Sequence, residues 1–311
     1  MALVTICVLT YNPDWIKFRN TLRSIICQRN VDFDIVVSDD GSEENYFDKA
    51  EEFLKENNFS DYRFIANKQN QGTVKNTISA LQNVESKYVK LISPGDFLYN
   101  EKVLSEFVDF AEKNPAVAYF GNAVYYSVDE KKGIIIYDGK HNPIDLKPWI
   151  NKDYRKIRKK YLYDIDYILG AAFLCNRVMF SDYLHRIDGA IKYLEDFSMA
   201  WMIIARKKIL YFDEIFIFYE YGSGVSTSTA TWVKRLKEDI MKGCDLVYRN
   251  HDMSYFEYIL CKSTNPYVRL LFRLILDPLC FLDRFKKTEV IKNDMEKNQR
   301  EFIQTLRRIL N

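Results

Sequence analysis

Residues 88–98, with the sequence YVKLISPGDFL, decide the fold. The apolar run 88–92 predicts a buried strand. It has to end at the SPG turn of 93–95, because proline cannot donate to a sheet ladder and glycine accepts unusual backbone angles. Asp96 then places a carboxylate at the carboxyl end of the strand. Ligands of open α/β sheets bind at this edge, so we expect Asp96 to face a phosphate-bearing ligand through a divalent cation.

Strand and helix patterns alternate before this stretch. Short β-branched apolar runs predict buried strands over residues 3–9, 33–37 and 62–66. Apolar residues at helical spacing and turn signals predict helices over 15–29, 43–57 and 73–84. Strand–helix–strand units of this length form parallel crossovers. The sequence therefore predicts an α/β protein with a Rossmann-like, mostly parallel sheet flanked by helices.

Two adjacent acids, Asp39 and Asp40, follow the second strand and precede Gly41. Their like charges repel, so we expect a donor or a cation between them. One interpretation is that Asp40 or Ser42 caps the helix predicted over 43–57. The functional interpretation is a carboxylate that accepts a hydrogen bond from a pyrimidine N–H or a ribose hydroxyl.

A second polar site is predicted at the start of the helix over 73–84. Gly72 and Thr73 lie at its beginning, and Lys75 lies in its first turn. A helix N-terminus attracts anions, and the lysine would add a positive charge there. The alternative is an ordinary surface lysine.

The region after Asp96 carries a second set of candidate residues. A helix is predicted over 101–113, and strands over 117–128 and 209–219. The basic stretch 129–160 is interpreted as a solvated charged face, with a loop near an anionic acceptor or a membrane as the alternative. Gly170 and Ala171 allow close approach of a ligand to the backbone. Glu195 and Asp196 precede a helix over 196–207; Asp196 could cap it, which would leave the second carboxylate unexplained.

Composition excludes several classes of protein. The chain has 311 residues, 48% hydrophobic and 28% charged, as expected of a folded globular protein. A net charge of +2 argues against nucleic-acid binding. The six cysteines show no CxxC spacing, which argues for a reducing compartment and against structural zinc. We find no signal peptide and no apolar run long enough to span a bilayer, so we expect a cytoplasmic protein.

The C-terminal part, 231–311, is expected to be a helical appendage. Residues 266–287 combine leucines with arginines and lysines, and Pro278 would kink or split a helix there. This segment has the character of an amphipathic helix that lies on a membrane surface. Docking onto the preceding domain is the alternative, and the sequence does not decide between them.

Four short motifs together resemble the family 2 glycosyltransferases, which are inverting enzymes of the GT-A fold. They are TYN at 10–12, SDDGS at 38–42, NQGTVKN at 70–76 and SPGD at 93–96. The resemblance covers roughly residues 3–230. It implies a catalytic domain over 1–230, with a nucleotide-binding half at 1–98 and an acceptor half at 99–230.

The resemblance implies roles for individual residues. Asp40 would read the base beside Asp39, Thr10 and Tyr11 would line it, and Lys75 would lie near the diphosphate. Ser93 and Asp96 would complete the donor site, with Asp96 touching the metal. Asp196 would be the general base and Glu195 its orienting neighbour. Gly170 and Ala171 would lie between donor and acceptor, and a loop with Ser223 and Ser226 would close over the diphosphate.

The sequence departs from the family pattern at the metal site. The motif is usually Asp-x-Asp-Asp, whereas residues 93–96 keep the last carboxylate alone. Relatives often have a histidine near the position of Tyr221. Mn²⁺ or Mg²⁺ at Asp96 is therefore expected to bind weakly without nucleotide. A literal DxD at 164–166 lies outside the nucleotide-binding half, and we interpret it as acceptor-side or structural.

The function expected from these observations is transfer of a hexose from a UDP-sugar to a hydroxyl of a glycan acceptor, with inversion. A polyprenyl-diphosphate-linked acceptor would place the enzyme on the inner face of the cell membrane, in assembly of a bacterial O-antigen or capsule. The alternative is a non-catalytic subunit that binds sugar nucleotides. A Rossmann-type dinucleotide enzyme is disfavoured, because no GxGxxG follows the first strand.

Overall fold

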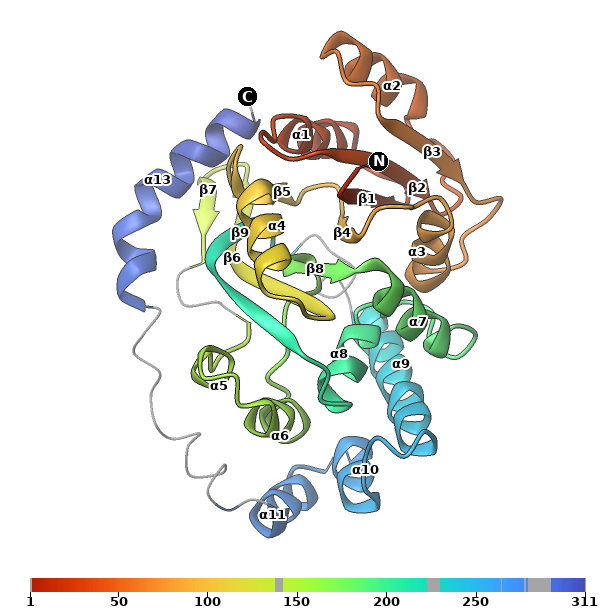
Figure 1. Cartoon of the computed structure of the whole chain (residues 1–311), viewed down its shortest axis with the longest axis vertical. Helices are drawn as coiled ribbons and strands as arrows, with labels where there is room; N and C mark the ends of the chain where they lie inside the picture. The colour runs from red at the N-terminus through yellow and green to blue at the C-terminus, as the bar shows by residue number, and fades with distance from the viewer. Residues whose placement is uncertain are drawn as a thin grey trace.

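The computed structural model is built on one mixed sheet flanked by helices, which confirms the α/β fold class (Figure 1). It describes residues 2–137, 142–222, 230–263, 265–276, 278 and 292–310. The strands follow the order β3-β2-β1-β4-β8-β6-β9-β5, and β7 pairs with β6.

The first half of the sheet is parallel and follows the sequence prediction closely. Its strands are β1 (Val4–Thr10), β2 (Phe33–Asp39), β3 (Tyr62–Ala66) and β4 (Tyr88–Ile92). Three helices make the crossovers: α1 (Trp15–Ile26), α2 (Phe47–Glu56) and α3 (Thr73–Leu81). All the strand pairs here are parallel, so the carboxyl ends of β1, β2 and β4 meet at one edge.

The second half of the sheet contains antiparallel strands that the sequence analysis did not predict. Its strands are β5 (Phe97–Leu98), β6 (Ala118–Asp129), β7 (Gly133–Ile136), β8 (Phe173–Asn176) and β9 (Ile209–Glu220). β6 and β9 were expected, but β5, β7 and β8 are two to four residues long and too short for a periodic signal. The antiparallel β5–β9 pair brings the end of β9 beside the turn that follows β4.

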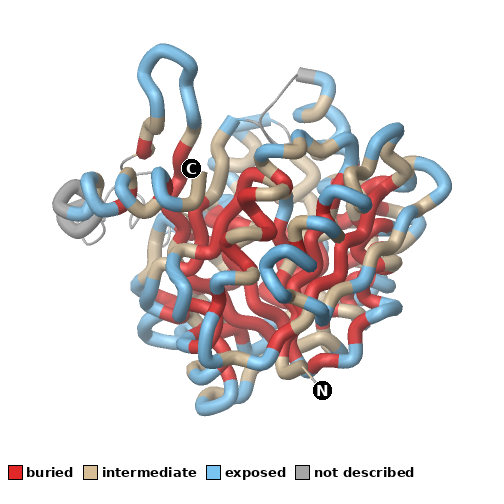
Figure 2. The backbone as a smooth tube through the Cα atoms, turned by 90° about the horizontal axis from the view of Figure 1, so that it is seen from above, coloured by how far each residue is buried: buried red, intermediate tan, exposed pale blue. Residues whose placement is uncertain are grey.

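Helices cover both faces of the sheet around a buried core, which is red in Figure 2. Those after β5 are α4 (Val103–Lys113), α5 (Lys147–Ile150), α6 (Tyr154–Asp164), the short turn η1 (Gly170–Ala172), α7 (Arg177–Ile187) and α8 (Phe197–Ile204). Side chains of β1 alternate between two core clusters: Cys7 belongs to one, and Ile6 and Val8 belong to the other. This alternation is expected of a strand buried on both faces.

The interpretation of residues 129–160 as a solvated charged face is wrong for two of its basic side chains. Arg158 and Lys160 lie on α6 and are each 7% exposed. Lys160 lies 3.4 Å from Asp145 and 3.9 Å from Asp164. These charges are buried because they are paired, so this part of the stretch is structural.

The C-terminal helices dock on the rest of the chain. They are α9 (Ala230–Arg249), α10 (Tyr255–Lys262), α11 (Pro266–Leu276) and α13 (Lys292–Leu310). Gly243 of α9 lies so close to Phe197 that a Cβ would be 2.4 Å from the ring. Phe302 and Leu306 of α13 are buried against the strands β5, β6, β7 and β9. In Figure 1 α13 runs beside β7 and brings the C-terminus next to α1.

Helix α11 is docked on one side and exposed on the other. Arg269 donates to the carbonyl of Leu260 at 3.0 Å, and Phe272 packs against the core. The opposite face is apolar and exposed, and we call it the α11 face: Tyr267, Leu270, Leu271, Leu274 and Ile275. Most of the expected helix beyond 276 falls outside the described residues. No helix in the described ranges is long and apolar enough to cross a membrane.

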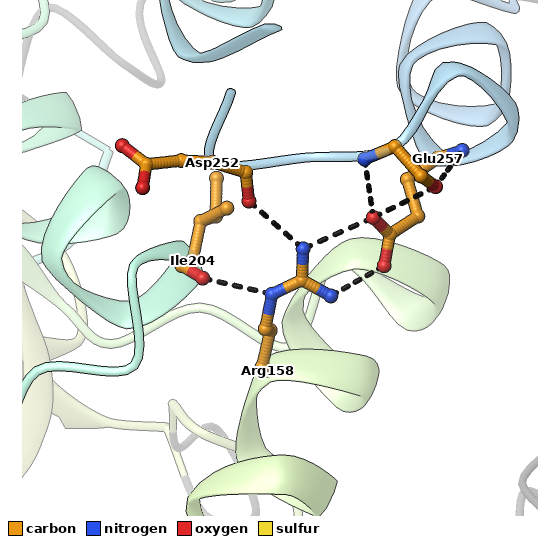
Figure 3. Close-up of polar contacts among 5 residues, drawn as sticks. Arg158, Ile204, Asp252 and Glu257 are labelled. Carbon is orange, nitrogen blue, oxygen red and sulfur yellow. Dashed lines mark hydrogen bonds and ion pairs between the residues drawn. The ribbon is translucent and has the colours of Figure 1, made fainter. Parts of the chain in front are cut away.

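A buried ion pair ties α10 to α6 (Figure 3). Both guanidinium Nη atoms of Arg158 donate to the carboxylate of Glu257, and its Nε donates to the carbonyl of Ile204 at 2.8 Å. Nη2 also donates to the carbonyl of Asp252 at 3.0 Å. Glu257 completes a capping box with Ser254. Burial alone would raise the pKa of Glu257, but the hydrogen bonds from Arg158 and Ser254 lower it overall.

We predict that Arg158→Met lowers the free energy of unfolding by about 3–5 kcal/mol, because it leaves a buried carboxylate without its partner. The measurement is urea denaturation at neutral pH. The pair stabilises the fold at pH values above the unfolded pKa of Glu257, and this contribution is lost as pH falls through the lowered folded value. The double variant Arg158→Met/Glu257→Gln keeps the capping box and should recover part of the loss. An equal loss in both variants would contradict the ion-pair explanation.

Candidate active site

The carboxyl edge of the parallel strands gathers most of the candidate residues. β1 ends at Thr10, β2 ends at Asp39, and the turn after β4 carries Asp96. These three strands are neighbours in the sheet, so their ends lie side by side. Crossover connections leave a crevice at such an edge, which is where open α/β sheets bind their ligands.

Asp39 joins the loops that follow β1 and β2. Its Oδ1 accepts from the hydroxyls of Thr10 at 2.9 Å and Ser42 at 2.5 Å, and its Oδ2 accepts from the backbone amide of Ser42 at 2.8 Å. The backbone amide of Asn12 donates to the hydroxyl of Ser42 at 2.6 Å. Hydrogen-bond donors are therefore present around Asp39. Thr10 is buried, whereas Tyr11 is 53% exposed beside it.

Asp40 holds the loop that leads into α3. Its two oxygens accept from the amides of Gln71 at 2.9 Å and Gly72 at 2.8 Å. Burial raises the pKa of Asp40, and these hydrogen bonds partly offset the rise. Gly72 has φ +95°, and a Cβ there would lie 2.4 Å from Lys192, so the close approach requires glycine. Base recognition by Asp40 stays a prediction.

The alternative role of Asp40 or Ser42 as a helix cap is wrong. Helix α2 begins at Phe47, and Tyr46 is its N-cap residue. Ser42 lies too far ahead of this helix and bonds to Asp39 instead. The side chains of Asp40 and Ser42 therefore bond to the loops at the carboxyl edge of the sheet instead of capping a helix.

Lys75 lies in the first turn of α3, as predicted, but it has a partner. Its ammonium pairs with Asp188 at 2.7 Å, and its side chain is 45% exposed. A role near a diphosphate would require the lysine to be shared with, or released from, Asp188. Ser93 is exposed at the turn after β4, and both donor-site roles stay predictions.

Asp96 is 6% exposed and sits in a closely bonded turn. Its Oδ1 accepts from the amide of Glu220 at 3.1 Å. Its backbone carbonyl accepts from the Thr21 hydroxyl at 3.0 Å, and the same hydroxyl accepts from the amide of Gly95. Burial raises the pKa of Asp96 to about 7, against the effects of the Glu220 amide and of Lys90.

Two charged residues that the sequence analysis missed lie beside Asp96. Lys17 donates to both carboxylate oxygens of Glu220, at 2.7 and 2.8 Å. Glu220 covers the turn so closely that a Cβ on Gly95 would lie 2.4 Å from its Oε2. Glu220 is the last residue of β9, and the pairing of β9 with β5 and β6 brings it to this turn. The sequence carries no local signal for that contact.

A third missed residue, Lys90, is completely buried in β4. Its ammonium donates to the carbonyl of Leu91 at 2.7 Å and to the carbonyl of Ala171. Burial lowers its pKa to about 7, although Asp96 favours the charged form. Lys90 therefore joins β4 to η1, which holds Gly170 and Ala171. A charged residue inside an apolar strand was the signal that could have found it.

Gly170 and Asp196 lie next to each other, a contact that the sequence analysis did not predict. A Cβ on Gly170 would lie 3.1 Å from Oδ2 of Asp196. Asp196 is the N-cap residue of α8, yet its side chain makes no capping hydrogen bond, so capping does not explain this carboxylate. Burial and the neighbouring Glu195 raise the pKa of Asp196 to about 7.

The segment that carries Glu195 and Asp196 lies against the nucleotide-binding half. Burial raises the pKa of Glu195. The Lys192 carbonyl accepts from the amide of Val74 at 3.2 Å. The segment before α8 therefore lies against the N-terminus of α3, next to the loop held by Asp40.

The metal expected at Asp96 fits these residues poorly. Nowhere in the described ranges do three or more His, Cys, Asp or Glu side chains gather as a group that could hold an ion. The two carboxylates at the turn are Asp96, which is buried, and Glu220, which is paired with Lys17. Ser223 and Ser226 of the predicted loop lie outside the described residues.

The DxD at 164–166 has structural contacts. Asp166 accepts from the backbone amides of Ile144 at 2.5 Å and Asp145 at 3.1 Å. Asp164 lies 3.8 Å from Arg273 of α11. These contacts hold the segment before α5 and the helix α11 in place, in agreement with the structural interpretation.

Comparison with known proteins identifies the fold. Similar solved structures include S. aureus TarS 1–349, with 14% identity and a TM-score of 0.55, covering 97% of this chain and 80% of that one. TarS 1–349 in complex with UDP-GlcNAc has 15% identity and a TM-score of 0.57, covering 98% and 80%. The complex with UDP has 14% identity and a TM-score of 0.53, covering 96% and 91%. No curated protein matches the sequence.

The family follows from the sequence itself. Residues 5–184, more than half of the chain, match the family described as Glycosyl transferase family 2. This match and the structural likeness confirm the predicted GT-A fold and a glycosyltransferase. The protein belongs to glycosyl transferase family 2.

Proposed function

We propose that this glycosyltransferase moves a hexose from a UDP-sugar to a hydroxyl of a glycan acceptor, with inversion at the anomeric carbon. The observation that carries the proposal is the contact between Gly170 and Asp196. It places a half-buried carboxylate, which has a raised pKa and makes no side-chain capping hydrogen bond, beside a residue that has no side chain. A carboxylate in such a place is suited to be a general base.

The proposed step is a single displacement. The oxygen of the acceptor hydroxyl forms a bond to the anomeric carbon, and the bond from that carbon to the β-phosphate oxygen breaks. Its electron pair leaves with UDP, and the hydroxyl proton passes to Asp196. Attack opposite to the leaving group gives inversion. Such general-base assistance contributes typically on the order of 10²–10⁴ in rate.

The donor site is proposed at the edge built by Asp39 and Asp40, with Thr10 and Tyr11 beside the base, and Lys75 and Ser93 toward the phosphates. Supporting this, the carboxylate of Asp40 holds the loop that leads into the N-terminus of α3, and a helix N-terminus favours anions. The TarS complexes with UDP-GlcNAc and UDP favour a uridine nucleotide. We do not include Mn²⁺ or Mg²⁺ at Asp96 in this step, because the neighbouring carboxylate of Glu220 is already paired with Lys17.

The acceptor is proposed to be a polyprenyl-diphosphate-linked glycan in the assembly of a bacterial surface polysaccharide such as O-antigen or capsule. The protein would work on the cytoplasmic side, peripherally on the cell membrane. The α11 face supports a membrane contact, because it exposes five large apolar or aromatic side chains on one helix. Tyr255 and Phe256 of α10 are exposed as well.

We predict that Asp196→Asn lowers kcat for UDP release from the preferred UDP-sugar by about 10²–10⁴-fold and leaves UDP affinity unchanged, because the variant lacks the base but keeps the donor site. Wild-type kcat should fall as pH decreases through about 7, where Asp196 takes up a proton. The measurement is UDP release over a panel of UDP-sugars between pH 5 and 9.

The matched control is Asp182→Asn, which removes an exposed carboxylate paired with Arg186. It should behave as wild type. If wild type binds UDP without turnover, even with a lipid-diphosphate acceptor, the protein is a binding subunit and the proposed transferase is wrong.

We predict that Gly170→Ala lowers kcat about 10-fold without a comparable loss of UDP affinity. The added methyl would lie 3.1 Å from Asp196, so the carboxylate has to move by a few tenths of an ångström. Thermal melting checks that the variant is folded. Unchanged kcat in Gly170→Ala would remove the steric argument for Asp196.

We predict that Leu271→Glu/Ile275→Glu weakens binding to phosphatidylglycerol vesicles by about 10-fold or more, because burial of two large apolar side chains is lost. Sedimentation with vesicles measures it. Val178→Glu changes an apolar residue of α7 that is 62% exposed and is the matched control. Equal binding by all three proteins would rule out the α11 face as a membrane contact.

A further inference from the structure

The turn at 93–96, which carries Asp96 as its one acidic residue, is approached by a second carboxylate from a distant strand. In the register of β5 and β9, Phe97 faces Phe218 and Leu98 faces Ile217. Continued toward the turn, this pairing places the end of β9 against Gly95, and the Glu220 amide donates to Asp96 at 3.1 Å. The Glu220 carboxylate then fills the space that a side chain at position 95 would need. Gly95, with φ +101°, leaves that space open.

A cation is already bound to this carboxylate. Lys17 lies in the first turn of α1, where its amide is fixed by the N-cap Asp14 at 2.9 Å. Its ammonium bonds to both oxygens of Glu220 at 2.7 and 2.8 Å. The Glu220 side chain is 10% exposed, whereas that of Lys17 is 40% exposed. The ammonium of Lys17 is thus fixed at the edge of the sheet and remains partly exposed to solvent.

The geometry of an ammonium leaves it able to bind an anion. It has three N–H donors, and two are directed at the Glu220 oxygens. The third is available for a phosphate oxygen, and lysine binds phosphates as a compact point charge. A divalent ion at the same place would need uncommitted carboxylates, but Glu220 is committed to Lys17 and Asp96 is buried.

We propose that Lys17, held by Glu220, is the cation that meets the diphosphate of the donor in place of a divalent metal ion. This inference rests on the proposed function, which supplies the nucleotide-diphospho sugar. As the bond to the anomeric carbon breaks, negative charge builds on the leaving diphosphate, and a fixed ammonium stabilises it without coordination chemistry. Glu220 acts as a positioning residue, because it orients Lys17 and does not contact the substrate.

The test measures UDP binding by isothermal titration calorimetry, in chelator and in Mn²⁺. Wild type should bind equally in both. Lys17→Met should bind at least about 10-fold more weakly in chelator, the usual magnitude for loss of a charged hydrogen bond. Mn²⁺ should restore part of its affinity, because the substitution releases Glu220 beside Asp96. Lys17→Arg keeps a positive charge and should bind in chelator, which separates loss of charge from failure to fold.

The matched control is Lys87→Met. Lys87 pairs with Glu112 at 2.6 Å and is 50% exposed, but it lies just before β4, away from the carboxyl edge. It should bind UDP as wild type does. Loss of wild-type binding in chelator, or full binding by Lys17→Met in chelator, would overturn the role of Lys17 and leave the transferase standing. Absence of UDP binding and of turnover under every condition would overturn both proposals.

Discussion

The buried ammonium of Lys90 is the contact on which the geometry of the site depends. An unpaired charge inside a protein is costly, so its neighbours have to supply acceptors. The carbonyls of Leu91 and Ala171 do so, and the ring of Phe216 lies 5.0 Å from the nitrogen. Since Ala171 belongs to η1, the same bond fixes Gly170, and through Gly170 it sets the space left for Asp196. The β4–β8 pair joins the parallel and antiparallel halves of the sheet, and Lys90 adds a bond from β4 to η1, just before β8.

Charge at the carboxyl edge is organised by bonds between segments that are distant in sequence. Asp40 accepts from the loop before α3, and Asp96 accepts from the end of β9. Each carboxylate is buried, and hydrogen bonds to charged groups are stronger than neutral ones, so these bonds hold the loops in place before any ligand arrives. A preorganised polar site does not have to reorganise during the reaction, which is the source of most electrostatic catalysis.

The parts of the fold that the sequence predicts well are those with local causes. The strands β1 to β4 are apolar runs that end at turn residues, and their boundaries differ from the prediction by two residues at most. The short strands β5, β7 and β8 form because a longer neighbour supplies their partners, and no periodicity marks them. The burial of Arg158 and Lys160 also has a long-range cause. Their charges predict exposure to solvent, whereas their ion-pair partners Glu257 and Asp145 are brought to them by packing.

The site shows the same division between local and long-range causes. Asp39, Asp40 and Asp96 stand at the ends of predictable strands, whereas the proximity of Gly170 to Asp196 depends on packing and was not predicted. Lys17 and Glu220 are separated by 203 positions and meet because β9 returns beside β5 and β6. Along the sequence, residues 93–95 lack the carboxylates of the family motif. In the folded chain, the side chain of Glu220 lies against Gly95 and is paired with Lys17. Under the proposed function this turn needs a fixed positive charge beside the diphosphate, and Lys17 of α1, held by Glu220 of β9, would supply it.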